Sequence, residues 1–131
     1  MEASNCEIIK IVKPIIVNKG WGHEEHVVND KINKYCGKLL VFNEAGYKGS
    51  MHFHIEKHEH FRVGEGKFRI DCINSSNAER YSLDLENGDI VEVPRGQPHR
   101  IVCVEKGYIT EFSTPDEIFD SYRVEKGDSQ K

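Results

Sequence analysis

The sequence lacks the features that mark membrane, secreted and nucleic-acid-binding proteins. Its longest apolar stretch near the N-terminus, residues 8–17, is broken by two lysines and Pro14, so it is too short and too charged to span a bilayer. It also lacks the three-part pattern of a secretory signal peptide. Neither charge sign forms a long run, and 18 basic against 22 acidic residues give a net charge of -4. We therefore expect a cytoplasmic protein with no membrane or nucleic-acid partner.

Cysteine is scarce, and no two cysteines form a CxxC pair, which excludes the common zinc and redox motifs built on that spacing. The four cysteines are widely separated: Cys6, Cys36, Cys72 and Cys103. In a reducing compartment such residues are most often free thiols, some of them packed in the core.

Short strand-like segments fill most of the 131 residues. Runs of about five to eight residues, rich in β-branched and aromatic side chains, are separated by Gly, Asn, Ser and Pro. The clearest are YCGKLLVF, SMHFHI, EHFRVGEGKFRIDCI, YSLDL, DIVEVP, HRIVCV and YITEFS. No helical periodicity competes with them. This pattern predicts an all-β domain, built as an antiparallel sandwich or barrel.

The two ends of the chain differ from this pattern. Residues 1–20 form a predicted N-terminal arm whose segment EIIKIVKPIIV suits extended structure, with Pro14 favouring an edge position. This arm can complete the sheet of its own domain or pair with a second subunit. Residues 21–125 form the predicted barrel, and the polar residues 126–131 are expected to be a flexible tail.

One helix signal occurs near the C-terminus. The segment TPDE, which begins at Thr114, has the spacing of a capping box with proline at the first helical position. Ile118, Phe119 and Tyr122 would give the helix an apolar side. We therefore predict a short C-terminal helix.

Four potential metal ligands occur in two short segments. His52, His54 and Glu59 lie in GYKGSMHFHIEKHEHFRVGEG, and His99 ends GDIVEVPRGQPH. Residues two apart in a strand share a face, so His52 and His54 point the same way, and inward-facing residues of a barrel can converge. Three imidazoles and a carboxylate suit one divalent transition metal ion: Mn, Fe, Zn, Ni or Co.

Other histidines are weaker candidates. His58 can replace Glu59 as a ligand if the turn before it is one residue shorter than we assume. His60 faces the other way by strand parity, and His23 and His26 lie outside both segments. We expect these side chains to be solvated or to serve packing.

Four charged residues on predicted strands are candidates for contact with a substrate: Lys38, Arg69, Arg100 and Glu111. Glu111 is the preferred catalytic acid or base, because it alternates with Ile109 and Ser113 and so can face the cavity. Trp21, between two glycines, is expected to cover one end of the barrel. Cys103 shares parity with His99, and packing is its first interpretation.

The two ligand-bearing segments resemble the motifs of the cupin superfamily. The first motif, G-x5-H-x-H-x(3,4)-E-x6-G, is matched at Gly46, His52, His54, Glu59 and Gly66. The second, G-x5-P-x-G-x2-H, is matched at Gly88, Pro94, Gly96 and His99. The usual final Asn, which is not a ligand in the family, is replaced by Cys103. The resemblance implies a double-stranded β-helix, or jelly-roll barrel, with these four ligands.

Outside these motifs the chain resembles the C-terminal cupin domain of type II phosphomannose isomerases. WG near the start, KLLVFNEAG, EHF, EFST and DSYR carry this likeness, although Gly20 stands where that family usually has Pro. The resemblance implies a homodimer, for which the N-terminal arm is a candidate contact, and a metal-dependent sugar or sugar-phosphate isomerase similar to mannose-6-phosphate isomerase. An Fe-dependent dioxygenase and a non-catalytic sugar- or ligand-binding module remain the alternatives.

Overall fold

The computed structural model describes residues 8–131, which form one curled nine-stranded sheet. Its strands are β1 (Ile15–Lys19), β2 (Gly22–Asp30), β3 (Tyr35–Phe42), β4 (Met51–Phe53), β5 (Glu59–Ile73), β6 (Arg80–Leu85), β7 (Ile90–Val93), β8 (His99–Ser113) and β9 (Tyr122–Glu125). Single 3-10 turns occur at η2 (Ile118–Asp120) and η3 (Asp128–Gln130). Every strand pairing is antiparallel, so the predicted all-β jelly-roll architecture is confirmed.

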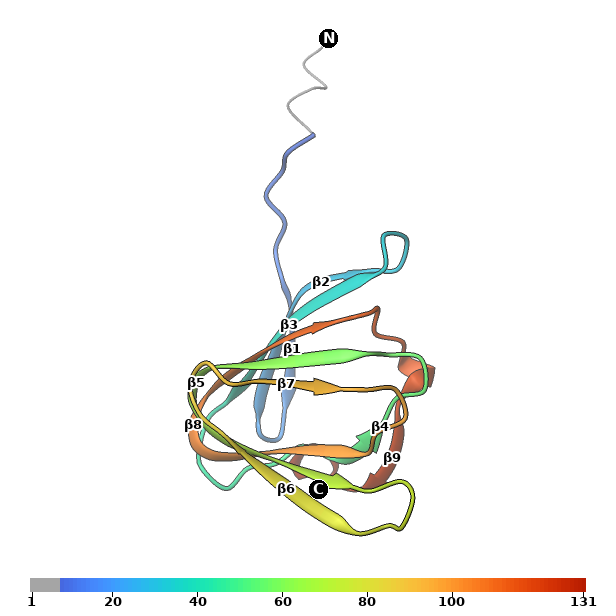
Figure 1. Cartoon of the computed structure of the whole chain (residues 1–131). Helices are drawn as coiled ribbons and strands as arrows, with labels where there is room; N and C mark the ends of the chain where they lie inside the picture. The colour runs from blue at the N-terminus through green and yellow to red at the C-terminus, as the bar shows by residue number, and fades with distance from the viewer. Residues whose placement is uncertain (1–7) are drawn as a thin grey trace.

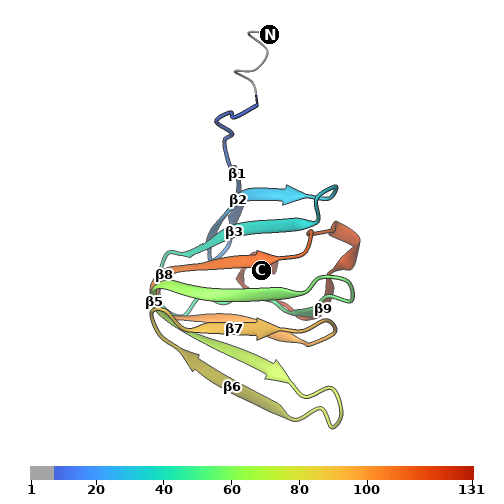
Figure 2. The ribbon, with the colours of Figure 1, turned by 45° about the horizontal axis from the view of Figure 1, so that its top comes forward.

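The barrel is organised around its two longest strands, β5 and β8, which pair along almost their whole length (Figure 1). β3 pairs with the C-terminal half of β8 and β4 with its first residue, both on the edge of β8 opposite β5. β3 continues the sheet to β2 and β1, β4 continues it to β9, and β5 also pairs with β6 and β7. Figure 2 shows how these strands curl around a common interior. The segments HRIVCV and YITEFS were predicted as two strands but form the single strand β8. Near Gly107 the pairing between β5 and β8 shifts its register, and the strand continues through this point.

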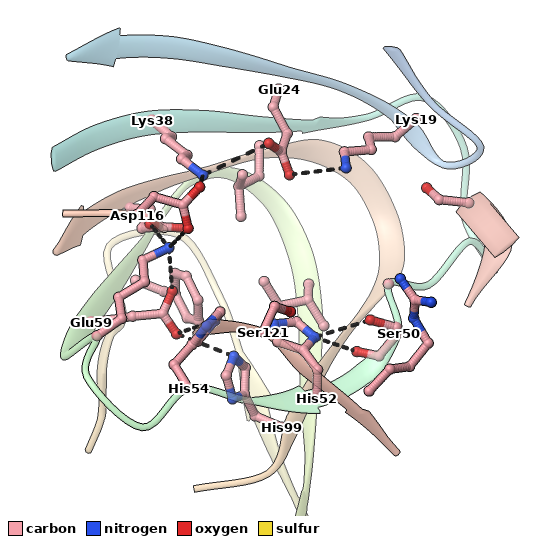
Figure 3. A pocket seen from close by; sticks show the side chains of 18 of the residues that line it. Lys19, Glu24, Lys38, Ser50, His52, His54, Glu59, His99, Asp116 and Ser121 are labelled. Atoms are coloured by element: carbon pink, nitrogen blue, oxygen red, sulfur yellow. Dashed lines mark hydrogen bonds and ion pairs between the residues drawn. The ribbon is translucent and has the colours of Figure 1, made fainter. Parts of the chain in front are cut away.

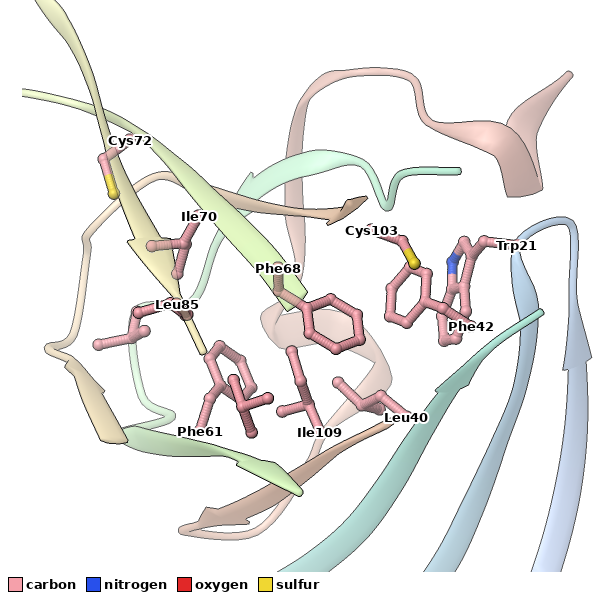
Figure 4. Packing of buried hydrophobic residues seen from close by; sticks show 12 residues of the cluster. Trp21, Leu40, Phe42, Phe61, Phe68, Ile70, Cys72, Leu85, Cys103 and Ile109 are labelled. Carbon is pink, nitrogen blue, oxygen red and sulfur yellow. The ribbon is translucent and has the colours of Figure 1, made fainter. Parts of the chain in front are cut away.

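Strand alternation fills the barrel with apolar side chains (Figure 4). On β5, Phe61, Val63, Phe68 and Ile70 are buried, while their neighbours along the strand are exposed or half-buried. The strand bends at Gly64–Gly66, which changes the alternation between its two halves. Every second residue is buried, as expected for a sheet with one face on the core and the other in solvent.

The aromatic end of the core contains the only tryptophan. The indole of Trp21 is buried and stacks on Phe42, with ring centroids 4.2 Å apart. Trp21 also lines the main pocket, so it forms part of a cavity wall as well as covering the barrel end. Cys103 is buried in the same cluster, and its packing interpretation fits this position.

The described part of the N-terminal arm leaves the barrel (Figures 1 and 2). β1 pairs with β2 alone, so it is an edge strand, and residues 8–14 have no regular secondary structure. This segment exposes four large apolar side chains: Ile8, Ile9, Ile11 and Val12. Residues 1–7 of the predicted arm, Cys6 included, lie outside the described residues.

The C-terminal segment differs from the predicted helix. Only the three-residue turn η2 forms, and its N-cap residue is Glu117 instead of Thr114. The Thr114 hydroxyl accepts a hydrogen bond from the amide of His58 (2.9 Å), and the Asp116 carboxylate accepts one from Lys38 (2.9 Å). The other capping-box residue, Glu117, accepts a hydrogen bond from Lys31 (2.9 Å), so both side chains that would have capped a helix are used in tertiary contacts.

Residues 126–131, expected to be a flexible tail, fold back onto the barrel. The Asp128 carboxylate accepts a hydrogen bond from the amide of Lys48 (2.6 Å), and the Asp128 amide donates one to the Lys48 carbonyl (3.0 Å). The Ser129 hydroxyl accepts a hydrogen bond from the amide of Gly20 (3.1 Å).

Within the described residues, we find no helix with the length and apolar character needed to cross a membrane.

Candidate metal centre

Three histidines meet at the floor of the main pocket (Figure 3). His52 lies on β4, His54 follows its last residue, and His99 begins β8 directly opposite His52 in the antiparallel pairing. One ring nitrogen from each lies within 4.8 Å of the others. The two sequence segments are therefore brought together by the β4–β8 pairing.

Each imidazole is oriented by a backbone carbonyl. The Nδ1 atoms contact the carbonyls of Ser50 for His52 (3.0 Å), Asp120 for His54 (2.7 Å) and Gln97 for His99 (2.9 Å). Nδ1 must carry the proton to donate to a carbonyl, so each Nε2 is left with a free lone pair. Histidine ligands of metal ions are held in this way.

Glu59 lies beside the histidines, and its carboxylate is close to two of the three. Its Oε2 is 3.2 Å from Nε2 of His99 and 3.7 Å from Nε2 of His54. Oε2 of Glu59 and Nε2 of His99 are both buried and have no hydrogen-bond partner among the described residues. Two buried acceptor atoms without partners at one point are costly unless another group satisfies them.

Burial and neighbouring charges set the protonation of this group. Burial, together with His99 and His54, lowers the pKa of His52 to about 3, so its imidazole is neutral near pH 7. Burial alone would raise the pKa of Glu59, but His99 and Lys57 hold it below its ordinary value. A neutral imidazole and an ionised carboxylate are the forms that bind metal ions.

The turn between His54 and Glu59 is fixed by Asp120. Its carboxylate is buried and accepts hydrogen bonds from the amides of Ile55 (2.8 Å), Glu56 (3.0 Å) and Lys57 (2.9 Å). Its carbonyl also orients His54. A single residue from η2 therefore sets both the turn and one of the histidines.

A second contact ties the other ligand segment to the same turn. The amide of Gly96 donates to the carbonyl of His54 at 2.6 Å, in the turn that leads to His99. Gly96 has a φ of +79°, a region that residues with a Cβ atom rarely adopt. The motif glycine is thus required by the backbone of the turn.

An ion-pair cluster surrounds Glu59, the predicted carboxylate ligand. The ammonium of Lys57 is buried and lies 3.2 Å from Glu59, 2.7 Å from Glu111 and 3.1 Å from Asp116. Burial alone would lower the pKa of Lys57, but Glu111, Glu59 and Asp116 raise it well above its ordinary value. Asp116 also pairs with Lys38 at 2.9 Å, so the cluster extends from the ligands along the pocket wall.

The pocket above the histidines has a volume of ≈ 230 Å³. This is slightly below the range of about 300–1,000 Å³ that is usual for ligand pockets. Its wall includes Lys38, Glu24 and Lys19 (Figure 3). Arg123 also lines the pocket, is exposed, and has no hydrogen bond or ion pair within residues 8–131.

The predicted substrate-contacting residues divide into two groups. Lys38 and Glu111 line the pocket, and both are buried. Arg69 and Arg100 do not line it. Arg69 pairs with Asp71 at 2.6 Å, and Arg100 follows the inward-facing His99 and donates to backbone carbonyls of neighbouring loops. Adjacent strand residues face opposite sides, which explains the placement of Arg100.

The four remaining histidines do not line the pocket. His58 pairs with Glu92 at 2.7 Å, and His60 is exposed. His58 therefore does not replace Glu59 beside the other histidines. His23 and His26 are half-buried and pair with glutamates on their own strand, instead of being simply solvated.

Sequence reasoning missed three residues of this site: Lys57, Asp116 and Asp120. Lys57 lies two residues before Glu59, and this spacing could have indicated that the two side chains point the same way. Asp116 and Asp120 lie in a segment without strand periodicity, and their partners are far away in the chain. No local pattern indicates such contacts.

The donor set fits a divalent transition metal ion. Three imidazoles whose Nδ1 atoms contact backbone carbonyls, beside a buried carboxylate, match the ligands that such ions prefer. The orphaned atoms of Glu59 and His99 would gain a partner. The three histidines could thus hold a metal ion, whose identity the donor types leave open.

Comparison with solved structures shows the same fold. The capsular polysaccharide assembling protein CapF from Staphylococcus aureus matches with a TM-score of 0.72 at 18% identity, over 88% of this chain and 33% of that one. Oxalate decarboxylase from Bacillus subtilis matches with a TM-score of 0.68 at 16% identity, over 88% of this chain and 33% of that one. The chain spans about a third of the length of these proteins.

Oxalate decarboxylase from Lactobacillus farciminis, in its formate complex, gives a TM-score of 0.69 at 16% identity, over 85% of this chain and 34% of that one. No curated protein matches the chain by sequence. These likenesses show the fold alone, and they do not support the finer resemblance to phosphomannose isomerases.

A family model for the polysaccharide biosynthesis C-terminal domain matches residues 29–126, which include all four predicted ligands and most of the barrel. The chain belongs to the polysaccharide biosynthesis C-terminal domain family.

Proposed function

We propose that this chain is a metal-dependent cupin that acts on a small carbohydrate, as a sugar or sugar-phosphate isomerase. One observation carries the proposal: the candidate ligands and the buried carboxylate of Glu111 line the same small pocket. The family description, which refers to polysaccharide biosynthesis, favours a carbohydrate over other hydroxylated substrates.

His52, His54, Glu59 and His99 would hold the ion. When bound there, a divalent ion supplies Lewis-acid polarisation of a substrate oxygen. The tautomers fixed through Nδ1 and the orphaned Oε2 of Glu59 support this ligand assignment.

Glu111 is the proposed base. Its carboxylate accepts a hydrogen bond from Ser113 (3.0 Å) and pairs with Lys57 (2.7 Å), so its orientation in the pocket is restricted. In an isomerisation, this carboxylate takes a proton from a carbon next to a carbonyl and returns it to the neighbouring carbon. The C–H electron pair first forms a carbon–carbon double bond and then binds the returned proton. The former carbonyl oxygen gains a proton and the neighbouring hydroxyl loses one, so the O–H electron pair of that hydroxyl forms the new carbonyl.

The pocket also offers cations for an anionic substrate. Arg123 is exposed at the pocket and without a partner among residues 8–131, and Lys19 has only a 4.0 Å contact with Glu24. Guanidinium and ammonium groups bind phosphate. These two residues support a phosphorylated sugar as substrate.

Deuterium exchange tests the reaction. Protein loaded with Mn²⁺, Co²⁺, Zn²⁺ or Fe²⁺ is incubated with mannose 6-phosphate or fructose 6-phosphate in D₂O, and exchange is followed by NMR. We expect exchange at the carbon next to the carbonyl, reduced about 100-fold or more in Glu111→Gln. Glu92→Gln, on the outside of β7, is the matched control.

Two other outcomes separate the alternatives. Oxygen consumption with Fe²⁺ and no exchange would identify a dioxygenase. Thermal stabilisation by the sugar without exchange or oxygen consumption would identify a binding module.

We also propose a cytoplasmic homodimer, in which the apolar residues of the arm contact the partner. The exposed side chains of residues 8–16 support this role, because six of them are large and apolar: Ile8, Ile9, Ile11, Val12, Ile15 and Ile16. Light scattering should give twice the monomer mass, and a monomer mass would contradict this part of the proposal.

A further inference from the structure

The buried ammonium of Lys57 treats the two oxygens of Glu59 differently. It lies 3.2 Å from Oε1 of Glu59. The other oxygen, Oε2, faces His99 and His54 and has no hydrogen-bond partner among the described residues. One oxygen is therefore engaged by a cation, while the other is free toward the histidines.

Lys57 also joins this ligand to the proposed base. Its side chain is only 3% exposed, and it contacts Glu111 at 2.7 Å as well as Glu59. A lysine ammonium has three donors, and here three carboxylates surround it. The ammonium thus bridges the proposed ligand on β5 and the proposed base on the neighbouring strand β8.

We propose that Lys57 is a positioning residue that restricts Glu59 to binding the metal ion through Oε2 alone and holds Glu111 beside it. This inference rests on the proposed metal site. It assigns to Lys57 a role that the ligands themselves do not perform: it sets the number of oxygens that Glu59 offers.

A purely structural role is the competing explanation, since any buried ammonium needs carboxylate partners. Lys38 provides the matched control for it. Lys38 is also buried and also pairs with Asp116, but no contact joins it to Glu59 in residues 8–131. Loss of Lys38 therefore disturbs the same cluster without freeing Oε1.

The test is titration of folded protein with Co²⁺ alone, followed by visible absorption, in wild type, Lys57→Met and Lys38→Met. In Lys57→Met, we expect Co²⁺ to bind about 10-fold or more tightly, because a cation beside the ligand is gone. We also expect weaker absorption per bound ion, because both oxygens of Glu59 can then bind and Co²⁺ absorbs less strongly as its coordination number rises. Lys38→Met should resemble wild type in band intensity.

Lys57→Met removes the positive charge that pairs with three carboxylates, so this variant can fail to fold. The double variant Lys57→Met/Glu111→Gln removes one charge of each sign, and the same two changes are expected in it. Absorption per bound Co²⁺ equal to that of wild type in the folded Lys57 variants would overturn the inference while leaving the metal site intact. Absence of Co²⁺ binding in wild type would overturn the metal site and this inference together.

Discussion

At the scale of single residues, Asp120 carries the largest share of the site's local order. Its buried carboxylate accepts hydrogen bonds from three consecutive amides, and its carbonyl orients His54. Side chains that replace a missing backbone partner in this way hold turns together. The predicted ligands His54 and Glu59 flank the turn that Asp120 holds, so their separation depends on it.

Replacing Asp120 should therefore damage both stability and metal binding. We expect Asp120→Ala to lower the free energy of unfolding by at least about 3 kcal/mol, since several buried amides lose their acceptor. Urea denaturation measures this change, and metal titration should show weaker binding. Asp30→Ala is the control, because Asp30 accepts from two amides in an exposed turn. Equal losses in the two variants would contradict the special role of Asp120.

Some residues of the site can be predicted from the sequence, and others cannot. His52, His54, Glu59 and His99 follow from strand parity and motif spacing, because period two fixes the direction of a side chain. Lys57, Asp116 and Asp120 do not follow, because their partners are distant in the chain and their segments have no period.

At the scale of elements, the glycine turns of the barrel differ in what they require. Gly66 and Gly96 both have positive φ, +90° and +79°. A Cβ atom at Gly66 would lie 2.5 Å from the carbonyl oxygen of Lys106, whereas one at Gly96 would meet nothing within 4 Å. The first position is limited by both space and conformation, and the second by conformation alone.

Alanine substitutions should separate these two effects. We expect Gly96→Ala to cost about 1 kcal/mol, the penalty of left-handed backbone. Gly66→Ala should cost about 3 kcal/mol, because the β5–β8 bend must also open. Thermal and urea unfolding measure both values. A larger loss in Gly96→Ala than in Gly66→Ala would contradict this account of the turns.

Elements were predictable where pattern and tertiary structure agree. Alternating segments became strands, and the barrel followed from their regular spacing and turns. The capping-box segment at Thr114 did not become an α-helix, because Thr114 and Asp116 use their side chains in tertiary contacts. The two segments of β8 were not joined in advance, because Gly107 reads as a break in sequence but lies inside a shifted pairing.

At the scale of the whole molecule, the ion-pair cluster around Lys57 makes the stability of the fold depend on pH. Burial alone would raise the pKa of Asp116, but Lys57 and Lys38 lower it below its ordinary value of 3.8. A carboxyl whose pKa is lower in the folded state stabilises the fold above its unfolded pKa. That contribution is lost as the pH falls toward the folded pKa.

The stability of the protein should therefore fall on acidification in a way that depends on Asp116. Between about pH 5 and pH 2, the free energy of unfolding should decrease less steeply in Asp116→Asn than in wild type. Denaturation at a series of pH values measures both slopes. Glu44→Gln, on an exposed loop, should keep the wild-type slope. An unchanged slope in Asp116→Asn would show that the cluster does not act as described.

The central claim is that His52, His54, Glu59 and His99 form one metal site, and elemental analysis of purified protein tests it most directly. The double variant His52→Ala/His99→Ala is compared with wild type and with His58→Ala/His60→Ala, whose histidines lie apart from the other three. We predict stoichiometric divalent metal in wild type and in the His58/His60 variant, and none in the His52/His99 variant. Stoichiometric metal in a folded His52/His99 variant would contradict the assignment.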